Sequence, residues 1–161
     1  GIQAAAFGAT QVCCVDSSAQ ALEGVEANAR LNGVEARVTT RRGAAPELMA
    51  VMHGAGNRFD VVILDPPAFI QRKKELNKGI AAYRRINELG LQLLHPGGLL
   101  VSASCSMHLS RAELIAAMQQ AAVRTGCQIR VVEQGAQGPN HPIHPAIPET
   151  EYLKAVFARK L

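Results

Sequence analysis

Apolar residues along this chain fall into short continuous runs that alternate with longer segments in which they recur every three or four positions. The short runs, typical of β-strands, lie at 11–15, 36–39, 61–64, 99–103, 129–132 and 152–158. The longer segments, typical of amphipathic helices, lie at 2–7, 21–31, 46–52, 80–94 and 111–125. Strands and helices that alternate at this spacing predict an α/β protein with a mostly parallel, doubly wound sheet.

The connection before the last strand differs from the others because it contains no helix. Residues 135–148 are rich in Gly, Pro and His and show no helical periodicity. Parallel neighbours need a long crossover connection, usually a helix, whereas antiparallel neighbours do not. We therefore predict that the last strand runs antiparallel to its neighbours.

Polar and glycine residues mark the ends of the predicted helices. Ser17 or Ser18 can cap the start of the helix at 21–31, and Ser110 can cap the helix at 111–125. Gly33 and Gly126 follow these two helices, where glycine commonly ends a helix. The sequence therefore defines both ends of these two helices.

The bulk composition is that of a folded globular domain. The chain has 161 residues, of which 48% are hydrophobic and 19% charged. No apolar run approaches the ~20 residues that a membrane-spanning helix needs, so we expect no membrane segment. The net charge of +4 suits a polyanionic partner such as RNA, although solvated helix faces explain basic clusters equally well.

The four cysteines predict free thiols rather than disulfides or a metal site. Cys13, Cys14, Cys105 and Cys127 show no CxxC spacing and no histidine at zinc-ligand spacing. Free thiols are typical of a reducing compartment, so we expect a cytoplasmic protein.

The segment at 59–69, FDVVILDPPAF, is the centre of the candidate site. Its unbroken apolar run is typical of a strand buried on both faces of a parallel sheet, and Asp65 follows directly where that strand ends. In open α/β sheets the ligand crevice lies beyond the carboxyl ends of the strands. Asp65, held by the stiff Pro66-Pro67 turn, is therefore placed to meet a substrate, although an ordinary strand-ending turn would have the same sequence.

Two other strand ends carry candidate functional groups. Asp16 ends an early strand, where a carboxylate can accept hydrogen bonds from ribose hydroxyls or can simply cap the next helix. Cys105 lies between two serines before a helix, a place that favours a reactive thiolate. A lone cysteine is more often a small buried hydrophobe, but the neighbouring Asp65 favours a functional interpretation.

Several motifs together carry a resemblance to a known family. They are DVVILDPPAF, the helix with Tyr83, Asn87 and Leu94, Pro96-Gly97-Gly98, Ser104-Cys105-Ser106, His141-Pro142, Pro148-Glu149 and Tyr152-Leu153-Lys154, with VDSSAQAL and NARLNG near the start. The chain resembles class I S-adenosylmethionine-dependent methyltransferases with a Rossmann-like sheet. It is most similar to the bacterial 23S ribosomal RNA 5-methylcytosine methyltransferases, which carry an N-terminal PUA domain.

The resemblance implies a cofactor, a substrate and a role for each candidate residue. The cofactor would be S-adenosyl-L-methionine and the partner ribosomal RNA. Cys105 would attack carbon 6 of a cytosine, and Asp65 would hold the edge of the base. The base that removes the C5 proton stays open between Asp65, a water molecule, His141 and Glu149. Cofactor contacts would come from Asp16, Ser17, Asp65 and Pro66, and substrate contacts from Pro67, Phe69, Ser104 and His141.

The resemblance also implies that part of the family's sheet is absent from residues 1–161. The family's first strand and Gly-rich loop should precede Gly1, so we expect residues 1–161 to be a catalytic domain that is incomplete at its N-terminus. The parent protein is expected to carry an upstream PUA domain, and a homodimer is one possible oligomeric state. Two strands would then lack their common neighbour. Two other functions remain open: a ribosomal RNA guanine-N methyltransferase with the same Asp-Pro-Pro turn, and a non-catalytic RNA-binding module.

Overall fold

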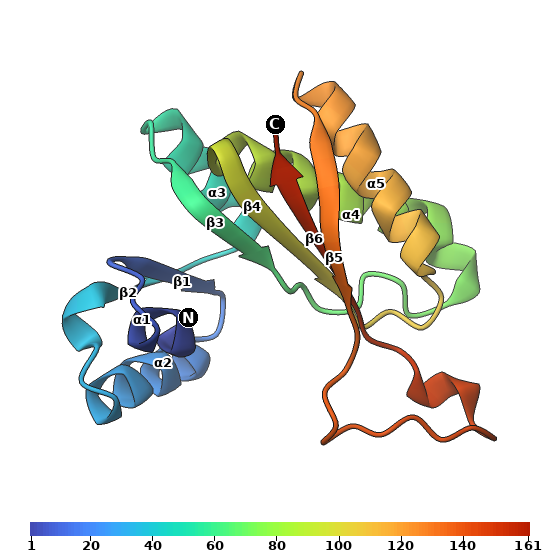
Figure 1. The fold of residues 1–161 in the computed structure, drawn as a ribbon, viewed down its shortest axis with the longest axis horizontal. Coiled ribbons are helices and arrows are strands. Elements are labelled where there is room, and N and C mark those ends of the chain that lie inside the picture. Colours follow the sequence, from blue (N-terminus) through green and yellow to red (C-terminus); the bar gives the residue numbers. More distant parts are fainter. The chain divides into compact units, whose positions relative to one another are not determined.

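The computed structural model describes residues 1–161, which fold into two compact units, Gly1–Gly54 and Ala55–Leu161 (Figure 1). Strands and helices alternate along both units, as the sequence predicts. The strands form two separate sheets, one in each unit, rather than one continuous sheet. β1 pairs only with β2, and β3 pairs only with β4, so that each has one unpaired edge.

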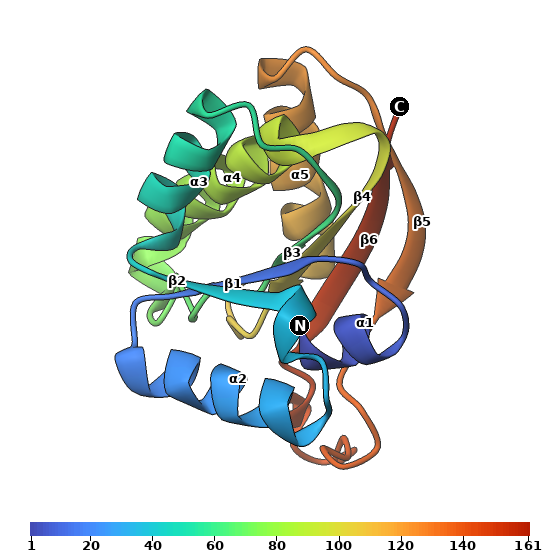
Figure 2. The same ribbon diagram turned by 90° about the vertical axis from the view of Figure 1, so that its left-hand side faces the viewer.

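The first unit is a two-stranded parallel sheet with three helices. Its elements are α1 (Ile2–Ala6), β1 (Val12–Asp16), α2 (Ala19–Leu31), a 3-10 turn (Glu35–Arg37), β2 (Val38–Arg42) and α3 (Ala45–Gly54). The helix α2 runs along the strand pair (Figure 2). A small apolar cluster centred on Ala5, Ala29 and Val34 fills this unit.

The second unit is a four-stranded sheet in the order β3-β4-β6-β5. Its elements are β3 (Phe59–Leu64), α4 (Leu76–Leu93), β4 (Leu94–Ser104), α5 (Arg111–Arg124), β5 (Ile129–Gly135) and β6 (Lys154–Lys160), with 3-10 turns at Lys73–Glu75 and Pro148–Thr150. β3 and β4 are parallel, whereas β6 lies antiparallel between β4 and β5. The predicted antiparallel last strand is confirmed.

The helices α4 and α5 cover one face of the four-stranded sheet (Figure 1). The core of this unit lies between the sheet and these two helices. Leu100 and Val156 on the central strands and Leu114 and Met118 on α5 are completely buried. Alternate strand residues reach this layer, so the burial has the two-residue period of a strand.

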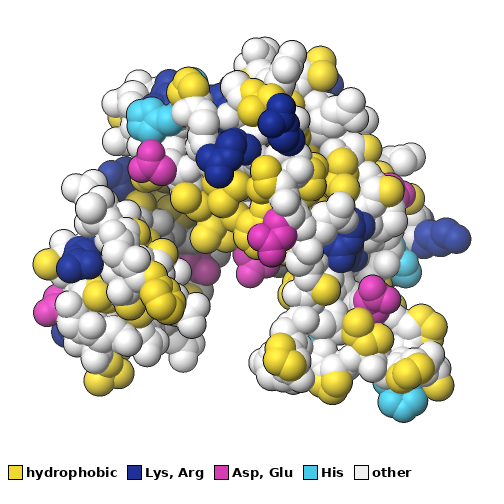
Figure 3. Space-filling view, in the orientation of Figure 1, with side chains coloured by type: hydrophobic (Ala, Val, Ile, Leu, Met, Phe, Trp, Pro, Cys, Tyr) yellow, Lys and Arg dark blue, Asp and Glu magenta, His cyan; other side chains and the backbone are white.

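The prediction that the 61–64 strand is buried on both faces is wrong for this structure. Val61 is 49% exposed and Ile63 is 61% exposed, whereas Leu64, which faces the helices, is 5% exposed. Figure 3 shows hydrophobic side chains gathered over this uncovered face of the sheet. β3 is an edge strand and the helices α4 and α5 cover a single face, so its apolar run is buried on one side only.

The predicted helix ends are confirmed, with shifts of a few residues elsewhere. Ser18 caps α2 and Ser110 caps α5, each accepting a hydrogen bond from a backbone N–H of the first turn. Gly33 and Gly126 adopt φ of +62° and +67°, the left-handed conformation that ends a helix. β2 and β6 each begin two residues later than predicted, and β4 begins at Leu94, five residues early.

The helix α4 begins at Leu76, four residues before the predicted start, because its first turn packs on the loop that precedes it. Gly79 is buried there, and a Cβ at this position would overlap Ile70 Cγ1. A glycine therefore permits the close approach of helix and loop.

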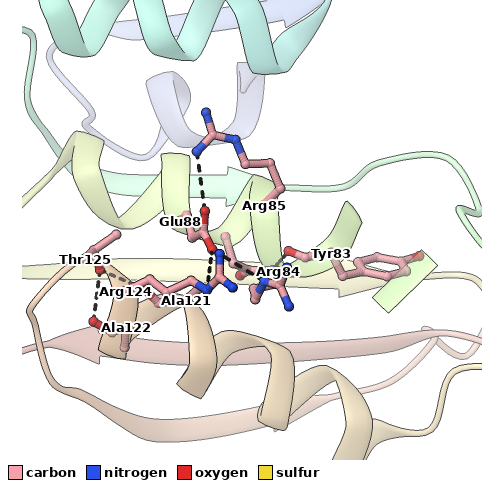
Figure 4. A network of polar contacts seen from close by, with 9 residues as sticks. Tyr83, Arg84, Arg85, Glu88, Ala121, Ala122, Arg124 and Thr125 are labelled. Atoms are coloured by element: carbon pink, nitrogen blue, oxygen red, sulfur yellow. Dashed lines mark hydrogen bonds and ion pairs between the residues drawn. The ribbon is translucent and has the colours of Figure 1, made fainter. Parts of the chain in front are cut away.

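A charged cluster joins α4 to α5 (Figure 4). The Glu88 side chain, 10% exposed, lies 3.5 Å from Arg84 Nε, 3.4 Å from Arg85 Nη1 and 3.6 Å from Arg124 Nε. Three guanidinium groups thus surround one carboxylate and compensate for its burial.

None of the helices is long and apolar enough to span a bilayer.

Candidate active site

The candidate site lies where β3 and β4 end side by side. These parallel strands are paired up to Leu64 opposite Ser102, so Asp65 and Cys105 both follow at the same edge of the sheet. Asp65 is exposed and Cys105 is half-buried. This edge is where ligands bind in open α/β sheets. The two residues that the sequence singles out therefore follow neighbouring parallel strands at the same edge of the sheet.

The two serines of the Ser-Cys-Ser turn point into the protein and hold it from inside. Ser104 is completely buried and Ser106 is 1% exposed. The Tyr83 hydroxyl is hydrogen bonded to Ser104 Oγ at 2.8 Å and to Ser106 Oγ at 2.9 Å. The Ser106 N–H also donates to Ser104 Oγ at 3.1 Å. This hydroxyl cluster leaves Cys105 as the half-exposed residue between two fixed neighbours.

The same hydroxyl cluster holds the loop that carries Asp65. The Ile70 N–H donates to Ser106 Oγ at 3.3 Å, and the Phe69 ring packs on the Tyr83 ring with centroids 4.9 Å apart. Tyr83 is fixed in turn by Asn87, whose Nδ2 donates to the Tyr83 carbonyl at 2.8 Å. The loop at 65–70 and the Cys105 turn therefore share one anchor on α4.

A buried lysine closes the Cys105 turn from the side of β6. Lys154, 8% exposed, donates from Nζ to the carbonyls of Ser106 and Leu109 at 2.6 and 2.7 Å. Burial lowers the pKa of Lys154, and the charge of Arg111 acts in the same direction. The charges of Cys105 and Glu113 oppose this shift and raise the pKa of Lys154. Lys154 therefore ties the segment that follows Cys105 to the start of β6.

The start of α5 is fixed just after the Cys105 turn. Ser110 and Glu113 form a capping box: the Ser110 N–H donates to Glu113 Oε2 at 2.7 Å, and the Glu113 N–H donates to Ser110 Oγ at 3.2 Å. The side-chain and backbone hydrogen bonds with Ser110 lower the pKa of Glu113. Arg111 donates to the carbonyls of Gly135 and Ala155, where the strands β5 and β6 meet the long loop.

Asp16 and Ser17 lie in the first unit, at the end of β1, as the sequence predicts. Asp16 is exposed, and its Oδ1 accepts a hydrogen bond from the Ser18 N–H at 2.7 Å. Ser17 is also exposed, and its carbonyl accepts from Arg42 Nε at 3.4 Å. Asp16 therefore shapes the turn before α2 and keeps its second carboxylate oxygen available for a ligand.

The predicted substrate residues differ in what they can touch. Pro66 is buried, whereas Pro67 and His141 are exposed. His141 belongs to the loop that leaves the sheet between β5 and β6 (Figure 1). Ser104 is completely buried and its hydroxyl is hydrogen bonded to Tyr83, so the structure does not favour the predicted contact of Ser104 with a substrate. The exposed basic residues beside the loop at 65–70 are Arg72, Lys73, Lys74 and Lys78.

Sequence reasoning assigned no role to Tyr83, Ser106 or Lys154, which together hold the site. One signal was available: Lys154 is a single charge at the start of the apolar run LKAVFA. A charged residue in such a run must find internal partners. No three side chains of the His, Cys, Asp or Glu type gather closely enough to hold a metal ion.

The sequence of this chain is similar to those of several known proteins. A family model described as "Conserved hypothetical protein 95" matches residues 1–120. The ribosomal RNA large subunit methyltransferase of Deinococcus radiodurans is 41% identical over 157 residues, covering 97% of this chain and 38% of that protein. The ribosomal RNA large subunit methyltransferase I of Shewanella denitrificans is 36% identical over 160 residues, covering 99% of this chain and 40% of that protein.

The fold matches that of a solved structure. SMU.776, which was assigned as a methyltransferase and solved in complex with SAH, superimposes with a TM-score of 0.82 at 15% identity, covering 98% of this chain and 41% of that chain. The fold is therefore the α/β Rossmann-like methyltransferase fold, mostly parallel with a final antiparallel strand. The chain spans about two fifths of the length of the curated relatives it matches.

Proposed function

This chain belongs to the family described as conserved hypothetical protein 95, and from that premise we propose that it methylates C5 of a cytosine in ribosomal RNA. The methyl donor would be S-adenosyl-L-methionine, and residues 1–161 would form part of the catalytic domain. The observation that carries this proposal is that an exposed aspartate and a half-buried cysteine follow two adjacent parallel strands at the same edge of the sheet. The names of its relatives support ribosomal RNA as the substrate.

The chemistry of cytosine explains why such an enzyme would need Cys105. Carbon 5 is a poor nucleophile, so the Cys105 thiolate first forms a bond to carbon 6 and makes carbon 5 electron-rich. Carbon 5 then takes the methyl group, which the cofactor supplies from its sulfonium centre. Loss of the C5 proton to a base restores the ring double bond, breaks the bond between sulfur and carbon 6 and returns the thiolate.

Asp65 would hold the base while this happens. A carboxyl group hydrogen bonded to the N3 and N4 edge of the ring stabilises the protonated adduct and distinguishes cytosine from uracil. The target base must leave its stack to reach this edge of the sheet, where exposed Pro67 and half-buried Phe69 lie beside Asp65. His141 can approach the base from the long loop. Ser104 would act from inside by holding the turn.

Asp16, Ser17 and Pro66 would serve the cofactor. Asp16 fits a ribose, because one of its carboxylate oxygens is fixed by the Ser18 N–H while the residue stays exposed. A carboxylate at the end of an early strand is the group that binds ribose hydroxyls in related α/β folds.

The proposal is tested with ribosomal RNA from cells that lack the gene, incubated with the longest natural protein that contains this chain. We expect base-resolved mapping to find one new 5-methylcytosine. Cys105→Ser should reduce its formation below detection, whereas Cys127→Ser, which alters a half-buried cysteine at the other end of α5, should leave it unchanged.

Two results would contradict the proposal. Methylation by Cys105→Ser at the wild-type rate would point to transfer onto an amino nitrogen, such as that of guanine, which needs no covalent step. RNA binding without any methyl transfer by the wild-type protein would indicate a non-catalytic module.

A further inference from the structure

The segment at 71–78 is strongly basic, and we call it the basic lobe. It contains four basic residues and one acidic residue, so its net charge is +3. The four basic residues are exposed: Arg72, Lys73, Lys74 and Lys78. Their side chains form no ion pair or hydrogen bond, since the ion pairs of this structure are those around Glu88. These charges are therefore available to a ligand from solution.

Both ends of the basic lobe are fixed beside the Cys105 turn. At one end, Ile70 is 2% exposed, and its N–H donates to Ser106 Oγ at 3.3 Å. At the other end, Gly79 is buried and lies so close to Ile70 that a Cβ would overlap its side chain. The two ends of the lobe therefore meet at a buried contact next to the candidate site.

The positions of these charges are unfavourable for the stability of α4. The N-terminus of a helix is the positive end of its macrodipole, where anionic side chains are stabilising and cationic ones are not. α4 begins at Leu76 with lysines in and just before its first turn, no acidic residue in that turn, and a cap residue, Glu75, whose side chain makes no capping hydrogen bond. α5 has the opposite arrangement, with Glu113 in its capping box. Helix stability therefore does not explain the basic lobe, and its charge favours a role in binding an anion.

We propose that the basic lobe binds the phosphate backbone of the RNA strand beside the cytosine that enters the candidate site. This inference rests on the proposed function. Moving a base out of its stack is costly, and contacts with the phosphates near that base fix the position of the strand without reading its sequence. Aromatic residues are only 4% of this chain, so stacking of neighbouring bases on exposed rings supplies little of the binding. Cations beside the site supply electrostatic attraction instead.

The first test measures how the longest natural protein that contains this chain binds a labelled single-stranded RNA, without cofactor and over a range of salt concentrations. One variant carries Lys73→Gln and Lys74→Gln. The matched control carries Arg30→Gln and Arg130→Gln, which alter two exposed residues that also form no ion pair. Arg130 lies opposite Arg159, at the end of the sheet remote from the Cys105 turn.

The expected effect follows from the release of counterions. Each phosphate contact steepens the dependence of log affinity on log salt by about 0.7 for a single strand. The lysine variant should therefore lose about 1.4 from this slope and bind about 25-fold more weakly near 0.1 M salt. Charges farther than about 10 Å from the RNA are screened at this salt, so the affinity of the control should change by less than about twofold. Equal slopes for the two folded variants would overturn the proposal.

A footprint on the wild-type protein covers the case in which a variant does not fold. Acetylation of lysines by an N-hydroxysuccinimide ester, followed by mass spectrometry, should slow several-fold at Lys73, Lys74 and Lys78 when RNA is bound. Lys160, whose Nζ donates to two backbone carbonyls, should react equally with and without RNA. Lysines of the lobe that RNA does not protect would overturn the proposal, and protection by polyglutamate but not by RNA would indicate an acidic protein partner instead.

Both tests are independent of methyl transfer. Cys105→Ser should bind RNA with the affinity of the wild type, because Cys105 is not part of the basic lobe. Failure of the binding and protection tests is therefore distinct from failure of the proposed function, which the methylation assay of Cys105→Ser decides.

Discussion

Tyr83→Phe tests whether the hydroxyl cluster on α4 stabilises the second unit. The substitution removes one oxygen atom and leaves the ring and its contact with Phe69 in place. That oxygen makes two hydrogen bonds, to Ser104 Oγ and Ser106 Oγ, in a site where all three residues are at most 1% exposed. A buried hydrogen bond contributes about 1 kcal/mol net, so the loss should be about 2 kcal/mol.

Urea denaturation followed by circular dichroism measures this loss. With a denaturant slope of about 2 kcal/mol per molar, the midpoint should fall by roughly 1 M urea. Tyr152→Phe is the matched control, because the half-buried Tyr152 has no hydrogen bond through its hydroxyl, and its free energy of unfolding should change by less than about 0.5 kcal/mol. The reasoning is refuted if Tyr83→Phe unfolds at the same urea concentration as Tyr152→Phe.

Three further substitutions, the first with a control variant, test other contacts by the same denaturation assay. Gly79→Ala should destabilise the protein by about 1–3 kcal/mol despite the higher helix propensity of alanine, because its Cβ would overlap the loop. The control Gly24→Ala in α2, where the space around the glycine is open, should stabilise it by up to about 1 kcal/mol. A gain of stability in both variants would contradict the overlap at Gly79. Glu88→Gln should cost about 2 kcal/mol, because three guanidinium groups lose their counter-charge, and unchanged stability would show that the cluster contributes nothing. Ser110→Ala should cost about 1 kcal/mol at neutral pH. The pKa of Glu113 is lowered in the folded state, so the stability that the capping box contributes is present above the ordinary glutamate pKa of 4.5. This contribution is lost as the pH falls through the lowered pKa. The difference in stability between Ser110→Ala and the wild type should therefore shrink in acid.

Features set by neighbouring residues could be predicted from the sequence. Ser18 and Ser110 cap helices because a hydroxyl one position before a helix reaches the free N–H groups of its first turn. The antiparallel β6 followed from a connection without a helix. The position of Asp65 and Cys105 after neighbouring strands could be predicted because parallel strands end at the same edge of a sheet.

Features set by distant residues could not be predicted. An apolar run such as Val61–Leu64 shows that a strand has two apolar faces, but it carries no information on what covers each face; one is covered by helices and the other is exposed. Tyr83 reaches Ser106 across 23 positions and Lys154 reaches it across 48. Such contacts depend on how elements pack, which no local pattern encodes.

The place of β6 in the sheet has a consequence for the order in which this unit can form. The last strand of the sequence lies in the interior of the sheet, between β4 and β5, and its first residue, Lys154, holds the Cys105 turn. During synthesis from the N-terminus, β4 must therefore wait with one edge unpaired until some fifty further residues have emerged. Cys105 is synthesised well before β6, the strand that completes its turn. A chain that stops before Lys154 would lose not only a strand but also the contacts that close this turn.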